Sequence, residues 1–146
     1  MTEDSNNIKL AEHQIAALNA HDIDLYLQRI DNSYVGESET LPGPVHGPEG
    51  ARQALTMLFT GFPDLRIEVE QLLSSGNHVI ARLRMTGTHK GNFAGIAPTN
   101  KPVSWQSCSV VELRNGKAIR NRVYADNASL LRQLGVLNLP KTATAG

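Results

Sequence analysis

The chain has 146 residues, of which 40% are hydrophobic, so one domain with a sizeable core is expected. Its 14 basic and 14 acidic residues balance, which excludes the positive field typical of proteins that bind nucleic acid or anionic membranes. A single cysteine excludes an internal disulfide framework and favours a reducing compartment. With a polar N-terminus and no apolar run of membrane-spanning length, the sequence predicts a soluble cytoplasmic protein.

Helices are predicted in the first part of the chain. Apolar residues recur at helical spacing over residues 8–18, and Asn6 or Asn7 is a suitable cap. A second, short helix is predicted over 22–30, with Asp22 as its cap. Polar residues 31–33 end this helix, and Tyr34-Val35 can begin a short strand.

A loop with two prolines and two glycines is predicted over residues 40–47. A third helix then begins with Pro48 at its first position and Glu49 in its first turn, where each residue type is favoured. Residues 61–64, Gly-Phe-Pro-Asp, end this helix.

Strands are predicted in the second half. Apolar and polar residues alternate over 65–70 and again over 79–85, which is the pattern of half-buried strands. A loop follows over 90–101, and then a hairpin formed by residues 105–114 and 117–126. Helices followed by a run of antiparallel strands indicate an α+β domain, in which a strongly curved sheet encloses a cavity.

Asn115-Gly116 predicts the turn of that hairpin, because a type I′ turn needs positive φ at both positions. With a regular two-residue turn, Trp105 lies opposite Asp126. In the same register, Ser107 lies opposite Tyr124 and Ser109 opposite Arg122. Alternation then puts all six side chains on one face, whose polar mixture is typical of a cavity wall. A one-residue bulge would move part of this set to the other face.

The last helix is predicted after the hairpin, with Asp126 or Asn127 as its cap and Gly135 as its stop. Residues 141–146 are predicted to form a flexible tail. The whole chain, 1–146, is predicted to be one domain with an ordered core over about 8–137.

Four stretches together resemble the SnoaL-like polyketide cyclases: GPEGARQAL (47–55) with GFPDL (61–65), GTHKGNFAGIAPTNKPV (87–103), NGKAIRNRVYAD (115–126) and NASLLRQLG (127–135). That family shares the cone-shaped fold of nuclear transport factor 2 and ketosteroid isomerase. The resemblance implies a cone-shaped barrel around N-terminal helices, a homodimer, and intramolecular ring closure without metal or organic cofactor. It also implies that Asp126, at the end of the last long strand, is the general acid/base. The chain departs from the family at Arg122, where an aromatic residue is usual, and at Asn100, where glycine is favoured.

Two residues are candidate catalytic groups. Asp126 can abstract a proton α to a carbonyl if a dry pocket holds it within hydrogen-bond reach, whereas its alternative role is to cap the last helix. His89 is a possible acid/base partner across the cavity mouth, and the alternative is a histidine that bonds the loop backbone.

Candidate substrate-binding residues offer flat or polar surfaces. Trp105 can stack on an apolar substrate, Tyr124 can donate to an oxyanion, and Arg122 can polarise a carbonyl. The alternative for Trp105 is core packing, and that for Tyr124 is an ordinary position in the wall. The alternative for Arg122 is a solvated side chain. Ser107, Ser109, Tyr26 and Tyr34 complete the predicted set.

No metal, flavin or nicotinamide is predicted. The remaining histidines are scattered without the spacing of metal ligands, and no glycine-rich nucleotide loop follows a strand. A homodimer is predicted through an apolar strip made by Ile119, Val123, Cys108 and Val110.

These features favour a cofactor-free cyclase of secondary-metabolite biosynthesis that acts on a small apolar polyketide. Aldol, epoxide-opening and pericyclic ([4+2]-type) ring closures remain open; the pericyclic one needs mainly a shaped pocket. The rival class is a non-catalytic small-ligand-binding or assembly domain, and an epoxide hydrolase is a lesser rival.

Overall fold

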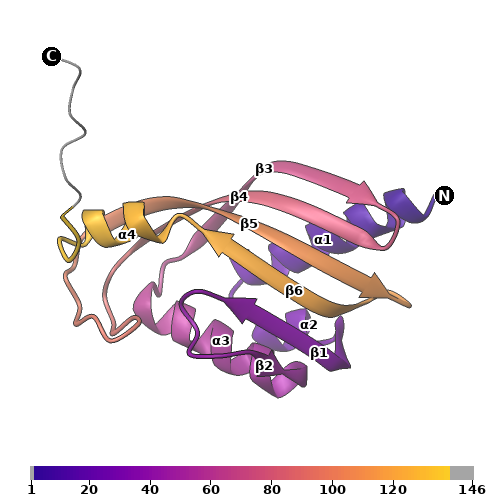
Figure 1. Cartoon of the computed structure of the whole chain (residues 1–146), viewed down its shortest axis with the longest axis horizontal. Helices are drawn as coiled ribbons and strands as arrows, with labels where there is room; N and C mark the ends of the chain where they lie inside the picture. Colours follow the sequence, from indigo (N-terminus) through magenta and orange to yellow (C-terminus); the bar gives the residue numbers. More distant parts are fainter. Residues whose placement is uncertain (1, 139–146) are drawn as a thin grey trace, which may run out of the picture.

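The computed structural model describes residues 2–138, and the predicted tail lies outside them. Helices and strands follow the predicted α+β order (Figure 1). In chain order they are α1 (Glu3–Asn19), α2 (Ile23–Leu27), β1 (Ile30–Ser38), β2 (Val45–His46), α3 (Gly47–Gly61), β3 (Arg66–Ser75), β4 (His78–Thr88), β5 (Pro102–Arg114), β6 (Lys117–Ala125) and α4 (Asn127–Gln133). None of the helices among residues 2–138 has the length and apolarity needed to span a membrane.

The N-terminal helices differ from prediction at their ends. α1 begins at Glu3, because the Thr2 side chain accepts a hydrogen bond from the Ser5 backbone N–H at 3.1 Å. The predicted cap at Asn6 or Asn7 is therefore wrong. Asp22 does cap α2, accepting from the Leu25 N–H at 3.0 Å. α2 ends before Ile30, which is the buried first residue of β1.

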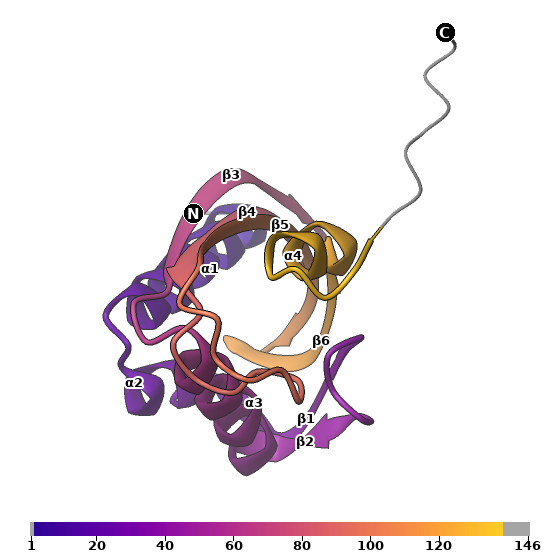
Figure 2. The ribbon, with the colours of Figure 1, turned by 90° about the vertical axis from the view of Figure 1, so that its left-hand side faces the viewer.

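Within residues 2–138 the strands form one six-stranded sheet in the order β2-β1-β6-β5-β4-β3. Neighbouring strands are antiparallel, except that β1 runs parallel to β6. The predicted purely antiparallel sheet is therefore corrected to a mixed one. The sheet is strongly curved and its two edges do not pair, so it encloses its concave side without closing into a barrel (Figure 2).

The β5–β6 hairpin has the predicted turn but not the predicted register. Asn115 and Gly116 both have positive φ, 52° and 73°. Arg114 pairs with Lys117 as expected, but a bulge in β6 leaves Ile119 without a partner. From there to the end of the hairpin each residue of β5 faces a partner one place later than predicted.

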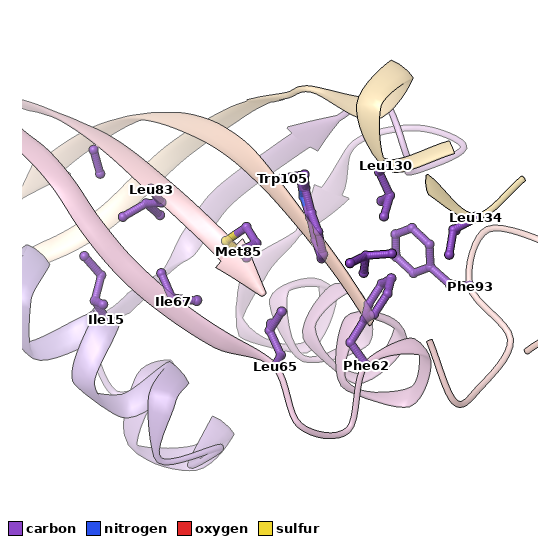
Figure 3. Packing of buried hydrophobic residues seen from close by; sticks show 12 residues of the cluster. Ile15, Phe62, Leu65, Ile67, Leu83, Met85, Phe93, Trp105, Leu130 and Leu134 are labelled. Atoms are coloured by element: carbon purple, nitrogen blue, oxygen red, sulfur yellow. The ribbon is translucent and has the colours of Figure 1, made fainter. Parts of the chain in front are cut away.

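Helices cover the concave side of the curved sheet (Figure 2). α1 packs along β3, α3 packs along β1, and α4 lies against β5. Between them is a buried apolar cluster that includes Phe62, Met85 and Trp105, whose side chains point into the same interior (Figure 3). The loop after β4 packs tightly on the end of α3, where a Cβ on Gly61 would lie 2.7 Å from the Cβ of Phe93.

Candidate functional site

A cavity of about 170 Å³ lies between the concave face of the sheet and α3. Most of its lining is apolar and comes from α2, α3, α4, the loop after β4 and strands β1, β4, β5 and β6. The lining residues include Tyr26, Tyr34, Gly36, Glu37, Met85, Phe93, Trp105, Ser107, Asn121, Val123, Ala125, Asn127 and Leu130.

Inward-facing residues of β5 and β6 form one wall of this cavity. Trp105 is 5% exposed and its ring centroid is 5.0 Å from that of Phe62. Ser107 follows on the same face of β5 and lies opposite Ala125, which also lines the cavity. Ser109 shares this face by alternation, opposite Val123, but is not part of the lining.

Arg122 and Tyr124 lie on the other, convex face, contrary to prediction. The bulge at Ile119 shifts the register, so that Arg122 pairs with Val110 and Tyr124 pairs with Cys108. Tyr124 is 54% exposed, and the Arg122 guanidinium carbon is 5.0 Å from its ring centroid. Arg122 also donates to a Glu39 carboxylate oxygen at 2.8 Å. These side chains therefore interact with one another outside the cavity.

Asp126 is an exposed helix cap. Its carboxylate Oδ1 accepts a hydrogen bond from the Ser129 N–H at 3.0 Å. Its own N–H donates to the carbonyl oxygen of Gln106 at 2.9 Å, which makes Gln106 its neighbour across the ladder. The predicted pairing with Trp105 is wrong for the same reason, the bulge in β6. Asp126 is absent from the cavity lining, whereas the next residue, Asn127, contributes to it.

His89 is fully buried at the end of β4. Its Nδ1 accepts from the Thr99 backbone N–H at 3.1 Å and lies 3.0 Å from the Thr99 hydroxyl. The neutral ring therefore carries its proton on Nε2, which has no partner in the described part of the chain. The His89 ring is tilted against that of Phe62, with centroids 5.6 Å apart, and His89 is not part of the cavity lining. The arrangement fixes the loop between β4 and β5.

Two tyrosines line the cavity from the helical side and from β1. Burial raises the pKa of Tyr34 to about 12, and a hydrogen bond from the Asn121 side chain lowers it in part. Burial also raises the pKa of Tyr26 far above its ordinary value, with a smaller contribution from Tyr34. Both phenols therefore stay protonated at neutral pH and can donate hydrogen bonds.

Asn121 is a cavity residue that the sequence did not indicate. It lies beside Gly36 in the parallel β1–β6 ladder and opposite Val111 of β5. Its Oδ1 atom is buried and has no hydrogen-bond partner within the described residues. In the regular register it would face away from Trp105, and only the bulge brings it to the inner face.

Metal-binding clusters are absent from residues 2–138: no group of three or more His, Cys, Asp or Glu side chains could hold an ion there. Among the described lining residues, Glu37 alone carries a carboxylate. That carboxylate lies 3.9 Å from the Arg120 guanidinium on the outer side of β1 and β6. The described interior therefore offers shape, neutral hydrogen-bond donors and a buried acceptor without a partner, Asn121 Oδ1.

Comparison with known proteins places this geometry in a family. The chain is 27% identical over 133 residues to the aklanonic acid methyl ester cyclase DnrD of Streptomyces peucetius, covering 90% of this chain and 92% of the relative. AclR, a proposed hydroxylase from Streptomyces galilaeus, superposes with a TM-score of 0.83 at 26% identity, over 95% of this chain and 91% of AclR.

A proposed SnoaL-like polyketide cyclase from Jannaschia sp. CCS1 shares the fold, with a TM-score of 0.85 at 21% identity over 94% of this chain and 97% of that one. The sequence model of the SnoaL-like polyketide cyclases matches residues 9–134. The chain therefore belongs to the SnoaL-like polyketide cyclase family.

Proposed function

We propose that the protein is a polyketide cyclase of secondary-metabolite biosynthesis that closes a ring within one substrate molecule inside the cavity. Its family and its curated cyclase relative support this function. The observation that carries the proposal is the cavity itself, which is mostly apolar but has a buried phenol, Tyr34, in its wall. An apolar, folded polyketide chain matches such a wall, and the phenol can hold one of its oxygens.

The interior favours a ring closure that depends mainly on shape and on hydrogen-bond donation. Trp105 gives the folded chain a flat apolar surface, which limits the conformers it can adopt. Tyr34, kept neutral by its raised pKa, can donate to an oxygen on which negative charge develops. Of the predicted chemistries, the pericyclic closure, assisted here by hydrogen-bond donation from Tyr34, therefore fits these residues better than one that needs a carboxylate.

Asp126 as general acid/base remains a prediction, and the geometry gives it little support. To act inside the cavity, its carboxylate would have to leave the Ser129 N–H and turn to the inner face. Glu37 contributes to the lining, but its carboxylate pairs with the Arg120 guanidinium at 3.9 Å. His89, the other predicted catalytic group, contacts Thr99 and lies outside the lining.

The size of the cavity restricts the substrate. Pockets for drug-sized ligands usually have volumes of about 300–1,000 Å³, whereas this one has about 170 Å³. A small substrate fits directly, and a larger polyketide would require the cavity to widen.

Single-turnover conversion of a linear polyketide precursor tests the function. We expect Tyr34→Phe to lower the rate by about tenfold to a hundredfold, near the lower range for losing one donor to a developing oxyanion. Tyr124→Phe is the matched control, because it removes the same hydroxyl from the convex face, and its rate should stay at the wild-type value. A wild-type rate no higher than the uncatalysed one would instead indicate a ligand-binding domain.

We also infer a homodimer formed through the convex face. Val110 and Cys108 lie there beside Tyr124, whereas Val123 of the predicted strip faces the cavity and cannot contribute. Light scattering should give twice the monomer mass, and Val110→Glu should give the monomer mass. A wild-type monomer at micromolar concentration would refute the inference. Location in the cytoplasm stays a prediction from cysteine content.

A further inference from the structure

The Asn121 side chain is an unusual group in the cavity wall. Its Oδ1 is buried without a partner among residues 2–138, although the side chain lines a mostly apolar cavity. A buried polar atom without a partner destabilises a fold, so most such atoms find one. Because the side chain that carries this acceptor lines a ligand cavity, a ligand bound against it can supply the missing donor.

The surroundings of Asn121 define what that donor can be. A hydrogen bond from the Asn121 side chain lowers the pKa of the Tyr34 phenol, and because Oδ1 has no partner, the donor is the amide N–H. The phenol hydrogen is then available to a ligand. Gly36 lies beside Asn121 in the sheet, and Tyr34 lies over Gly36, with its Oη only 2.8 Å from where a Cβ would be. The free acceptor of Asn121 and the free donor of Tyr34 are therefore neighbours at one spot on the wall.

We propose that Asn121 and Tyr34 together bind one hydroxyl group of the substrate, either a phenol or an enol. The hydroxyl donates its hydrogen to Asn121 Oδ1 and accepts the hydrogen of the Tyr34 phenol. This assignment rests on the proposed cyclase function and makes Asn121 a specificity-determining residue for it. A hydroxyl satisfies both groups at once because it is a donor and an acceptor.

The pair should discriminate against other oxygen groups. A carbonyl or an ether oxygen offers no hydrogen to Asn121, so its Oδ1 would stay unpartnered. A carboxylate would put negative charge against the same oxygen. Sites that hydrogen-bond a substrate hydroxyl reject analogues lacking it, because buried protein groups are then left without partners. Other polar lining groups are less restrictive, since the Ser38 hydroxyl already bonds with that of Thr40.

Binding of 2-naphthol and 2-methoxynaphthalene tests the assignment, because the two probes differ in whether the oxygen carries a hydrogen. The chain has one tryptophan, Trp105 in the cavity wall, so a single indole N–H resonance reports on occupancy. We expect wild-type protein to bind 2-naphthol about tenfold more tightly, which corresponds to one hydrogen bond. Asn121→Leu should remove this preference, so that the two probes bind with equal affinity.

Asn6→Leu is the matched control, because it makes the same substitution on the exposed surface of α1. Thermal melting verifies folding, and if Asn121→Leu does not fold, Asn121→Ala takes its place. Tyr34→Phe is a second probe of the pair and should also reduce the preference. Failure of 2-naphthol to bind, equal binding of both probes by wild type, or a preference that survives in Asn121→Leu would overturn the assignment.

This result is separable from the proposed function, because probe binding needs no turnover. A preference for 2-naphthol in a protein that converts no polyketide would refute the cyclase and leave the hydroxyl site. An active cyclase without the preference would do the reverse.

Discussion

The hydroxyl of Tyr34 lies over the α-carbon of Gly36, two residues further along β1. Side chains two apart on a strand share a face, so a tyrosine can lean across its neighbour only if that neighbour is small. A Cβ on Gly36 would lie 2.8 Å from Tyr34 Oη and 3.0 Å from its Cε2. The glycine therefore determines where the phenol meets the cavity.

Gly36→Ala should consequently displace Tyr34. We expect a loss of about 1–3 kcal/mol in the free energy of unfolding, the usual cost of overpacking, and a reduced cyclisation rate. Gly43→Ala is the control, because a Cβ there meets nothing within 4 Å. Urea denaturation and the single-turnover assay provide the measurements, and equal effects of the two substitutions would contradict the argument.

Substitution of Asp126 separates a cap from a catalytic group. If it only caps α4, Asp126→Ala should destabilise the protein by about 1 kcal/mol, and Asp126→Asn by less, because asparagine also caps well. Both variants should retain the wild-type rate per folded molecule. A general base would instead make Asp126→Asn slower by about two to four powers of ten with unchanged melting.

His89 should matter for stability. His89→Leu leaves the Thr99 N–H without its acceptor, so we expect a loss of about 1–3 kcal/mol. Thr99→Val keeps that backbone hydrogen bond and removes only the hydroxyl, so its effect should be smaller. Urea denaturation measures both. A large loss of rate in a His89→Leu protein of normal stability would restore the catalytic interpretation.

Asp64 should contribute to the acid stability of the fold. The Thr88 backbone N–H, at 2.7 Å, lowers the pKa of this carboxyl, and the Thr88 hydroxyl lowers it further. A lowered folded-state pKa gives stability that is present above the unfolded value of about 3.9 and is lost as pH falls through the folded value.

Asp64→Asn should therefore lower stability at neutral pH and weaken its pH dependence below about pH 4. Urea denaturation across that range measures the effect, with Glu12→Gln as an exposed carboxylate control on α1. Parallel pH profiles for wild type and Asp64→Asn would show that the carboxyl contributes nothing.

Patterns that depend on nearby residues were predictable. Alternation along β3 and β4 correctly predicted that Ile67 and Met85 point inward, and the two are paired and buried. The positive φ of Asn115 and Gly116 followed from residue type alone. These features depend on local conformational preferences and on the spacing of apolar residues, and both can be read from the sequence.

Long-range pairing was not predictable in the same way. Residues 31–33 were predicted as a break, yet they belong to β1, where Asp31 is held by Ser33 and by Arg114 of β5. The bulge at Ile119 likewise reversed the faces of Arg122 and Tyr124. β6 pairs with a strand on each side, and no local residue preference indicates where its extra residue lies.

The unpaired Ile119 has a wider consequence, because it determines which side chains of β6 face the interior and therefore the charge of that interior. Without this residue Ala118 would be followed directly by Arg120, so the ladder would become regular while the rest of β6 kept its present partners and faces. If Ile119 instead paired with Glu112 in a ladder without a bulge, Arg122 and Tyr124 would enter the cavity, and Asn121 and Val123 would leave it. The same β6 sequence would therefore line a cationic chamber in a regular ladder, and one residue left out of the pairing gives an almost uncharged one.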